Sequence, residues 1–427
     1  MSLAVATPPV AIAVRRVWRT TALAALVLQP VSLPAQQVLP APLQAAAASG
    51  LPASDVPVAV QIVRWHMNDG DLNALSFRSM DQIFTTRSVP RSGPVWRLPK
   101  SERALDFTYA WQGRNIAAED FLERTYTNAL MVIKDGRVVV ERYRNGSDER
   151  SRFIGWSMTK SITSVLIGCA LAEGRIESLD KPISDYLPEL KGGGYEGVSI
   201  RHVMQMRSGV DYEERYDFAN PGRAASNHIN SLVRNTTRFA DAARTLPRIH
   251  KPGEFFQYKT IDTAVLGWLV ERVTRGSVAA YTARCLWEPL GAESDGFYIM
   301  DGAPGVGREF SGAGFNATLR DFGRFGQMML QGGVADGRRI VSADWVQQST
   351  SPNGPEDNRR GGYGLQWWTL GGGTYSAIGL QGQYVFVDPG TRTVVVKLSY
   401  FPPGDNTALD GETQAFLKAA SAWKPAL

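Results

Sequence analysis

The chain has 427 residues, of which 44% are hydrophobic and 20% are charged. These values are ordinary for a globular protein with a sizeable buried core, and the length suits one large or two ordinary domains. A net charge of +5 over this length, without a run of five basic residues, argues against binding to nucleic acid.

Residues 1–40 differ from the rest of the chain. Arg15, Arg16 and Arg19 precede a short apolar run at 22–28, and proline and small residues follow it. This order resembles a secretory signal, but the apolar run is too short to cross a bilayer. We therefore expect an exported, periplasmic protein without a transmembrane helix. A disordered Ala/Pro-rich leader on a cytoplasmic protein is the alternative.

Residues 41–119 begin as an Ala/Pro-rich linker and continue without a clear period, so we interpret them as an irregular N-terminal extension. Two β-rich runs, 129–133 and 137–143, then flank Lys134-Asp135-Gly136, which predicts a hairpin. The segment 157–173 has helical spacing, few charges and a following Gly174. It therefore predicts a buried helix.

The region 199–309 reads as an all-helical domain, with its clearest helices at 201–207 and 258–275. A further helix is predicted at 319–331, and strands follow at 367–370, 384–387 and 393–398, the last two joined by a turn at 388–391. Strand patterns thus occur at both ends of the chain. We expect an α/β fold of the α+β type, in which residues 120–198 and 310–427 form an antiparallel sheet flanked by helices. A cleft should separate this domain from the helical one.

The metal-binding and redox residues are few. Cys169 and Cys285 lie far apart in apolar surroundings, so we expect two buried free thiols rather than a disulfide. The four histidines show no spacing typical of a metal site. We expect neither a metal nor an organic cofactor.

Ser157-Met158-Thr159-Lys160 opens the predicted buried helix. Residues three apart share a helix face, so the lysine amine can lie beside the serine hydroxyl. Burial lowers the pKa of a lysine, which can then take the serine proton, while the helix N-terminus supplies N–H groups for an oxyanion. The pattern is weak by itself, because an N-cap serine with a solvated lysine has the same spacing.

Several further blocks occur in a fixed order around this tetrapeptide: Gly174-Arg175-Ile176, Arg207-Ser208-Gly209, 252–258, Pro289-Leu290-Gly291 and 318–326. Together with the hairpin they resemble the class C β-lactamase-related serine hydrolases over about residues 128–402. This family has the β-lactamase and penicillin-binding-protein fold and includes β-lactamases, D-alanyl-D-alanine carboxypeptidases, esterases and 6-aminohexanoate-dimer hydrolases.

The resemblance implies roles for particular residues. Ser157 is the nucleophile, Lys160 its partner, and Tyr258 of Tyr258-Lys259-Thr260 the general base or proton relay. Thr260 replaces the usual amide or serine and is expected to hydrogen-bond Lys160 or the substrate. The backbone N–H groups of Ser157 and Gln383 are expected to form the oxyanion hole.

Gly379-Leu380-Gln381-Gly382-Gln383 stands where β-lactamases have Lys-Thr-Gly. Gly382 fits a position of close backbone approach. Leu380 replaces the cation that helps to bind the penicillin carboxylate, which argues against a true β-lactamase or carboxypeptidase. Tyr216, which is either a substrate contact or an ordinary exposed tyrosine, is a further candidate for the cleft, with Asn316 and Trp368.

These features are most like the 6-aminohexanoate-dimer hydrolase and esterase branch. We expect hydrolysis of a small carboxylic ester or linear amide through an acyl-enzyme on Ser157. Two alternatives stay open: a penicillin-binding protein, carboxypeptidase or β-lactamase, and a non-catalytic binding member of the fold. The expected partner is a small-molecule substrate, and the protein is expected to be a monomer or homodimer.

Overall fold

The structure is a computed structural model that describes residues 54–302, 305–353 and 361–425. The predicted leader, residues 1–40, lies outside this range. All described residues belong to one compact unit, Pro40–Leu427, so the predicted boundaries between a sheet domain and a helical domain stay a prediction. Among the described residues, we find no helix with the length and apolar character needed to cross a membrane.

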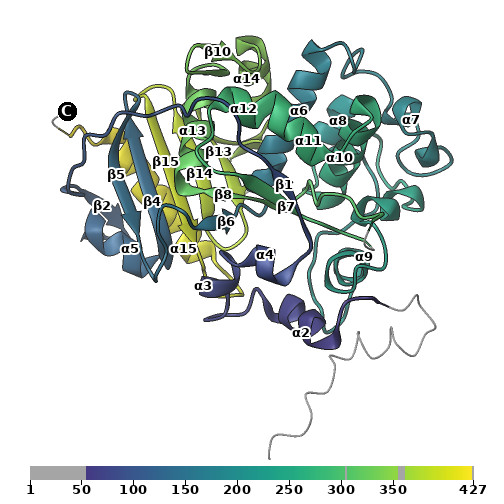
Figure 1. Ribbon diagram of the computed structural model, residues 1–427, viewed down its shortest axis with the longest axis horizontal. Helices are drawn as coiled ribbons and strands as arrows, with labels where there is room; N and C mark the ends of the chain where they lie inside the picture. Colours follow the sequence, from purple (N-terminus) through teal and green to yellow (C-terminus); the bar gives the residue numbers. More distant parts are fainter. Residues whose placement is uncertain (1–53, 303–304, 354–360, 426–427) are drawn as a thin grey trace, which may run out of the picture. The chain divides into compact units, whose positions relative to one another are not determined.

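The larger sheet has seven antiparallel strands and pairs residues 127–143 with residues 362–399, which lie far later in the chain (Figure 1). The predicted hairpin forms its β4 and β5, and β15 pairs with β4 from Thr393↔Lys134 to Ser399↔Thr127. The strand order is β11 (Gly362–Tyr363), β12 (Trp368–Gly371), β13 (Thr374–Gly379), β14 (Gln383–Asp388), β15 (Thr393–Ser399), β4 (Thr127–Lys134), β5 (Arg137–Tyr143).

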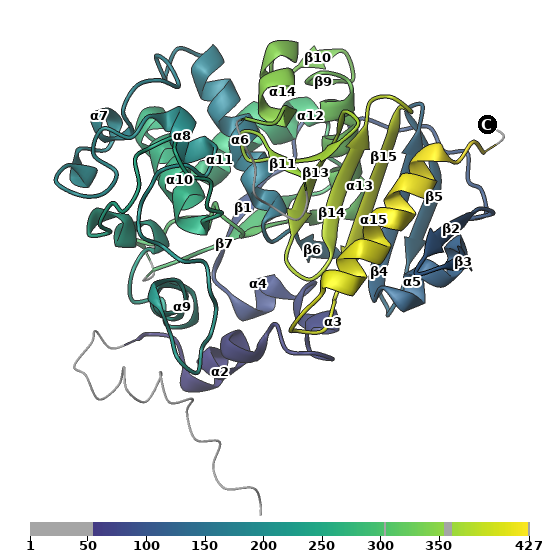
Figure 2. The same ribbon diagram turned by 180° about the vertical axis from the view of Figure 1, so that it is seen from behind.

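Helices cover both faces of this sheet. Along β4, Leu130 and Val132 belong to the hydrophobic cluster under α15 (Thr407–Ala422), whereas Met131 and Ile133 belong to the cluster under α13 (Leu319–Leu330). Figure 2 shows α15 lying across the strands on the side away from α13. All eight residues of β4 are buried because successive side chains point to opposite, equally covered faces.

A second antiparallel sheet of four strands lies beside the first sheet and was not predicted. Its order is β1 (Thr86–Val89), β7 (Gly296–Ile299), β8 (Phe315–Thr318), β6 (Arg152–Ile154). β7 falls in the region expected to be all-helical, and β1 in the extension expected to be irregular. These strands have three or four residues each, and β7 is buried throughout, so they carry no alternating pattern that marks a strand.

The rest of the N-terminal extension is also more regular than expected. It contains three short helices, α2 (Val58–His66), α3 (Asn73–Ser76) and α4 (Met80–Ile83), and a hairpin of β2 (Thr108–Trp111) and β3 (Arg114–Ala117). A short helix α5 (Phe121–Arg124) follows.

The predicted helices at 157–173 and 258–275 are confirmed as α6 (Met158–Ala172) and α10 (Thr260–Thr274), which pack against each other. Gly174 follows α6 with a φ of 67°, a conformation that glycine adopts easily at the end of a helix. The remaining helices are α7 (Ile183–Tyr186), α8 (Ile200–Met204), α9 (Arg223–His228), α11 (Val278–Thr282), α12 (Glu288–Leu290) and α14 (Ala343–Thr350).

The expectation of two free thiols is wrong, because Cys169 and Cys285 form a disulfide. The bridge joins α6 to the π-helical turn Ala283–Trp287. The two residues are 116 positions apart in sequence, but their Cα atoms lie 6.5 Å apart. The apolar surroundings that favoured a buried thiol suit a buried half-cystine equally well, so the sequence alone did not separate the two.

Candidate active site

Ser157 lies where β6 turns into α6. The preceding Trp156 has a left-handed backbone with a φ of 46°, and Ser157 occupies the N-cap position of the helix. Its side chain is half-buried, and its Oγ lies 2.9 Å from the Nζ of Lys160. The positive end of a 15-residue helix therefore points at the predicted nucleophile.

Lys160 is 1% exposed and donates three hydrogen bonds. Its Nζ lies 2.9 Å from Ser157 Oγ, 3.0 Å from Thr260 Oγ1 and 2.8 Å from the backbone oxygen of Gly312. Burial lowers the pKa of Lys160 to about 8, and the charge of Glu214 opposes this shift. A lysine with this pKa is partly neutral near pH 7 and can accept the proton of the serine.

Tyr258 and Thr260 lie beside this lysine, and Trp368, predicted as a cleft residue, lines the same pocket. The ring of Tyr258 is centred 5.0 Å from Lys160 Nζ and stacks on Trp368 with a centroid distance of 5.3 Å. The hydroxyl of Thr260, at the start of α10, accepts from Lys160 and donates to Glu214. Thr260 thus links the lysine to a carboxylate.

Glu214 was not identified from the sequence. Its carboxylate accepts hydrogen bonds from both the backbone N–H and the hydroxyl of Thr260, and from the hydroxyl of Tyr216 at 3.1 Å. The negative group therefore lies at the N-terminus of α10, where a helix dipole stabilises it. It occurs in a loop directly after another glutamate, Glu213. No sequence motif indicates which of the two glutamates reaches the site.

These residues line a pocket of about 530 Å³. Three carboxylates line it, those of Glu214, Asp405 and Asp410, and the described lining residues include no lysine or arginine. The full lining is Trp156, Ser157, Glu214, Tyr216, His228, Tyr258, Thr260, Phe310, Ala313, Trp368, Ile378, Gly379, Leu380, Gln381, Phe401, Gly404, Asp405, Asn406, Thr407 and Asp410. The pocket is therefore acidic, in contrast to the cation-bearing site that a penicillin carboxylate requires.

His228 is a second lining residue that sequence reasoning missed. It is 6% exposed, and burial lowers its pKa to about 4. Its ring packs against Tyr216 with a centroid distance of 5.6 Å. The imidazole is therefore neutral at ordinary pH and adds no positive charge to the pocket.

Three predicted residues lie away from the pocket lining. Gln383 begins β14, is 1% exposed, and its side chain donates to the backbone oxygen of Ser399 at 2.7 Å. The close approach at Gly382 is made by the Phe401 ring, which an added Cβ would meet at 2.6 Å. Asn316 is fully buried in β8, where its amide donates to the backbone oxygen of Gly314.

Leu380, by contrast, lines the pocket and is 48% exposed. It directly follows Gly379, the last residue of β13. The pairing of β13 with β12 stops at Ser376, opposite Trp368, so residues 377–379 of β13 extend beyond β12. A Cβ on Gly379 would lie 2.2 Å from the backbone oxygen of Gly155. The end of β13 is thus held directly against the segment that leads into Ser157.

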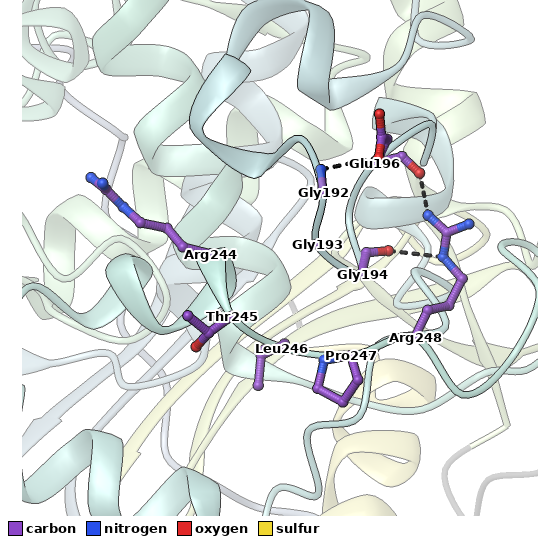
Figure 3. A pocket seen from close by; sticks show the side chains of 9 residues that line it. All are labelled: Gly192, Gly193, Gly194, Glu196, Arg244, Thr245, Leu246, Pro247 and Arg248. Carbon is purple, nitrogen blue, oxygen red and sulfur yellow. Dashed lines mark hydrogen bonds between the residues drawn. The ribbon is translucent and has the colours of Figure 1, made fainter.

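A second hollow, of about 520 Å³, lies beside the triple glycine Gly192–Gly194 (Figure 3). Arg248 donates to the backbone oxygen of Gly194 at 2.9 Å, and Arg244 pairs with Asp241 at 3.2 Å. These cations are therefore occupied by the protein itself, and none of the predicted catalytic residues lines this hollow. Within the described ranges, no group of three His, Cys, Asp or Glu side chains is placed to hold a metal ion.

The site has a serine at the start of a buried helix, a lysine one turn later that is hydrogen-bonded to it, and a strand end beside it. These features define a serine hydrolase of the penicillin-recognising class. Comparison with known families agrees: the beta-lactamase family model matches residues 117–420. The chain belongs to the beta-lactamase family and is a hydrolase.

Individual relatives refine this picture. The chain is 34% identical over 349 residues to the 6-aminohexanoate-dimer hydrolase of Paenarthrobacter ureafaciens, covering 78% of this chain and 86% of that protein. A Bacillus anthracis protein described as a 6-aminohexanoate-dimer hydrolase has a similar structure, with a TM-score of 0.74, 23% identity and coverage of 83% and 95%. A family VIII carboxylesterase is more distant, with a TM-score of 0.54, 16% identity and coverage of 71% and 95%.

Proposed function

We propose that the protein hydrolyses a small linear amide or carboxylic ester through an acyl-enzyme on Ser157. The observation that carries this proposal is the buried Lys160, whose Nζ lies 2.9 Å from Ser157 Oγ. The neutral lysine takes the serine proton as Oγ attacks the carbonyl carbon. Tyr258, whose ring lies beside the lysine, passes a proton to the leaving amine or alcohol. Water then attacks the acyl-enzyme with the same groups as base.

The oxyanion of each tetrahedral intermediate needs two N–H donors. We assign them to the backbones of Ser157 and Leu380, in place of the pair of Ser157 and Gln383 expected from the sequence. Leu380 lines the pocket and Gln383 does not. The contact between Gly379 and the Gly155 oxygen also brings the end of β13 to the start of α6.

The acidic lining selects the substrate. Glu214, Asp405 and Asp410 repel a carboxylate and attract an ammonium group. This supports a linear amide whose ammonium end enters the pocket. The 6-aminohexanoate dimer named for the relative with 34% identity has such an end, and its carboxylate end must then lie away from Glu214, Asp405 and Asp410. The acidic lining speaks against penicillins, whose carboxylate meets no cation in the described part of this pocket.

The test is a hydrolysis panel with purified protein: short p-nitrophenyl esters, linear 6-aminohexanoate amides and nitrocefin. Ser157→Ala should abolish turnover of the first two, and wild type should leave nitrocefin intact. Ser164→Ala is the matched control, because Ser164 is a buried serine on the same helix whose hydroxyl donates to the Leu365 backbone oxygen. Undiminished turnover by Ser157→Ala would refute the proposal.

A further inference from the structure

Two residues with left-handed backbones flank the proposed oxyanion hole. Trp156, with a φ of 46°, directly precedes Ser157, and Gln381, with a φ of 54°, directly follows Leu380. Neither residue is glycine, so each conformation costs about 1–3 kcal/mol and persists only where its surroundings hold it. The contacts that hold these two residues therefore decide where the two N–H donors lie.

Gln381 is held by the N-terminal extension. Its side-chain amide donates to the backbone oxygen of Asn68 at 2.9 Å and accepts from the amide of Asn73 at 3.4 Å. Asn73 also donates to the backbone oxygen of Phe401 at 2.7 Å. Asn73 is fully buried and Gln381 is 6% exposed, so water does not replace these hydrogen bonds if they are lost.

Trp156 is held from the same segment. The ring of Phe77 meets that of Trp156 edge to face, with centroids 5.5 Å apart. The backbone oxygen of Phe77 accepts from the N–H of Ile154 at 2.8 Å. Phe77 is 1% exposed and therefore forms part of the wall behind the chain that leads into Ser157.

We propose that residues 67–77 of the N-terminal extension complete the active site, with Asn73 as a positioning residue that acts through Gln381 on the N–H of Leu380. This inference rests on the proposed function. Oxyanion donors act only at hydrogen-bonding distance from the developing charge, and a misplacement of about 1 Å costs about 100-fold in rate. Asn73 touches no substrate; it fixes the turn that carries the donor.

The test compares Asn73→Ala with Asn128→Ala. Asn128 is also a fully buried asparagine at the contact with the extension, donating to the Ala74 backbone oxygen at 3.4 Å and accepting from Asn145. Both variants should unfold at lower temperature. Only Asn73→Ala should lose kcat, by about 10- to 100-fold with KM nearly unchanged, because the displaced donor acts in the transition state.

A second readout separates positioning from general damage. An alkylboronic acid forms a tetrahedral anionic adduct on the serine and so reports on the oxyanion hole. Its inhibition constant should rise in Asn73→Ala by the same factor as kcat/KM falls, and stay at the wild-type value in Asn128→Ala. If Asn73→Ala does not fold, Asn73→Ser, which keeps a short hydroxyl donor, is measured in the same way.

Equal kcat in the two variants, or unchanged boronate inhibition in the Asn73 variants, would overturn the inference. The outcomes also distinguish it from the proposed function. If Ser157→Ala keeps its activity, the proposed function itself is refuted. Activity lost in Ser157→Ala, with Asn73→Ala matching Asn128→Ala, removes only the role of the extension.

Discussion

Replacing Gly379 by alanine tests the contact between β13 and the segment that leads to the nucleophile. The added Cβ would lie 2.2 Å from the backbone oxygen of Gly155. An ordinary carbon–oxygen contact is about 3.3 Å, so the strand end must move away by about 1 Å. Because Leu380 is the next residue, its N–H moves with the strand, and a shift of this size should lower kcat by about 100-fold.

The assay is steady-state hydrolysis of p-nitrophenyl butyrate, with near-ultraviolet circular dichroism to confirm the native fold. Gly276→Ala is the control, because its Cβ would meet nothing closer than the Thr274 backbone oxygen at 4.0 Å. That variant should keep the wild-type kcat. A folded Gly379→Ala enzyme with a kcat close to wild type would refute the placement of the oxyanion donor on this strand end.

Two further predictions concern charge and the disulfide. With Lys160 active as the neutral base and its pKa lowered to about 8, kcat/KM should rise with pH through about 8 and then level off. The Glu214 carboxylate raises the pKa of Lys160, so Glu214→Gln should move the rise in kcat/KM to lower pH. Glu213→Gln, which changes a 73% exposed side chain, should leave the profile unchanged. An unmoved profile in Glu214→Gln would contradict an electrostatic effect of Glu214 on Lys160. Replacing Cys169 and Cys285 together by serine should lower the free energy of unfolding by about 2–5 kcal/mol in urea denaturation, because the bridge spans 116 residues. Equal stability of the double variant and wild type would show that the bridge contributes nothing.

The parts of the fold that the sequence predicted are those with strong local patterns. The hairpin of β4 and β5 follows from an Asp-Gly turn between β-rich runs, and α6 and α10 from long apolar helical stretches. β13 was missed, although it forms one wall of the pocket. Its residues follow three glycines, Gly371–Gly373, and end in another, and glycine gives no periodic signal.

The candidate site divides in the same way. Ser157, Lys160, Tyr258 and Thr260 lie in motifs of fixed spacing, and the structure brings them together. The position of Gln383 is different, because a turn of three residues separates β13 from β14. A motif that spans such a turn does not show which of its two sides faces the serine.

Glu214 and His228 escaped prediction for another reason. Glu214 lies in a loop and reaches the site through Thr260, which is 46 positions away in sequence. His228 ends a short helix and packs against Tyr216, a loop residue that also lines the pocket. The export signal, the oligomeric state and the domain boundaries stay predictions.

The pairing of β1 with β7, from Thr86↔Ile299 to Val89↔Gly296, has a practical consequence for protein production. The family match begins at residue 117, which makes that position an inviting start for a shortened chain. Such a chain would lack β1, so the backbone donors and acceptors of β7 that face β1 would lose their partner, whereas those facing β8 would stay paired. β7 is a strand of four buried residues. Exposed apolar strand edges pair with other copies of the same chain, so the shortened protein would tend to aggregate. By pairing with β7, β1 therefore protects this buried strand from pairing with another copy of the chain.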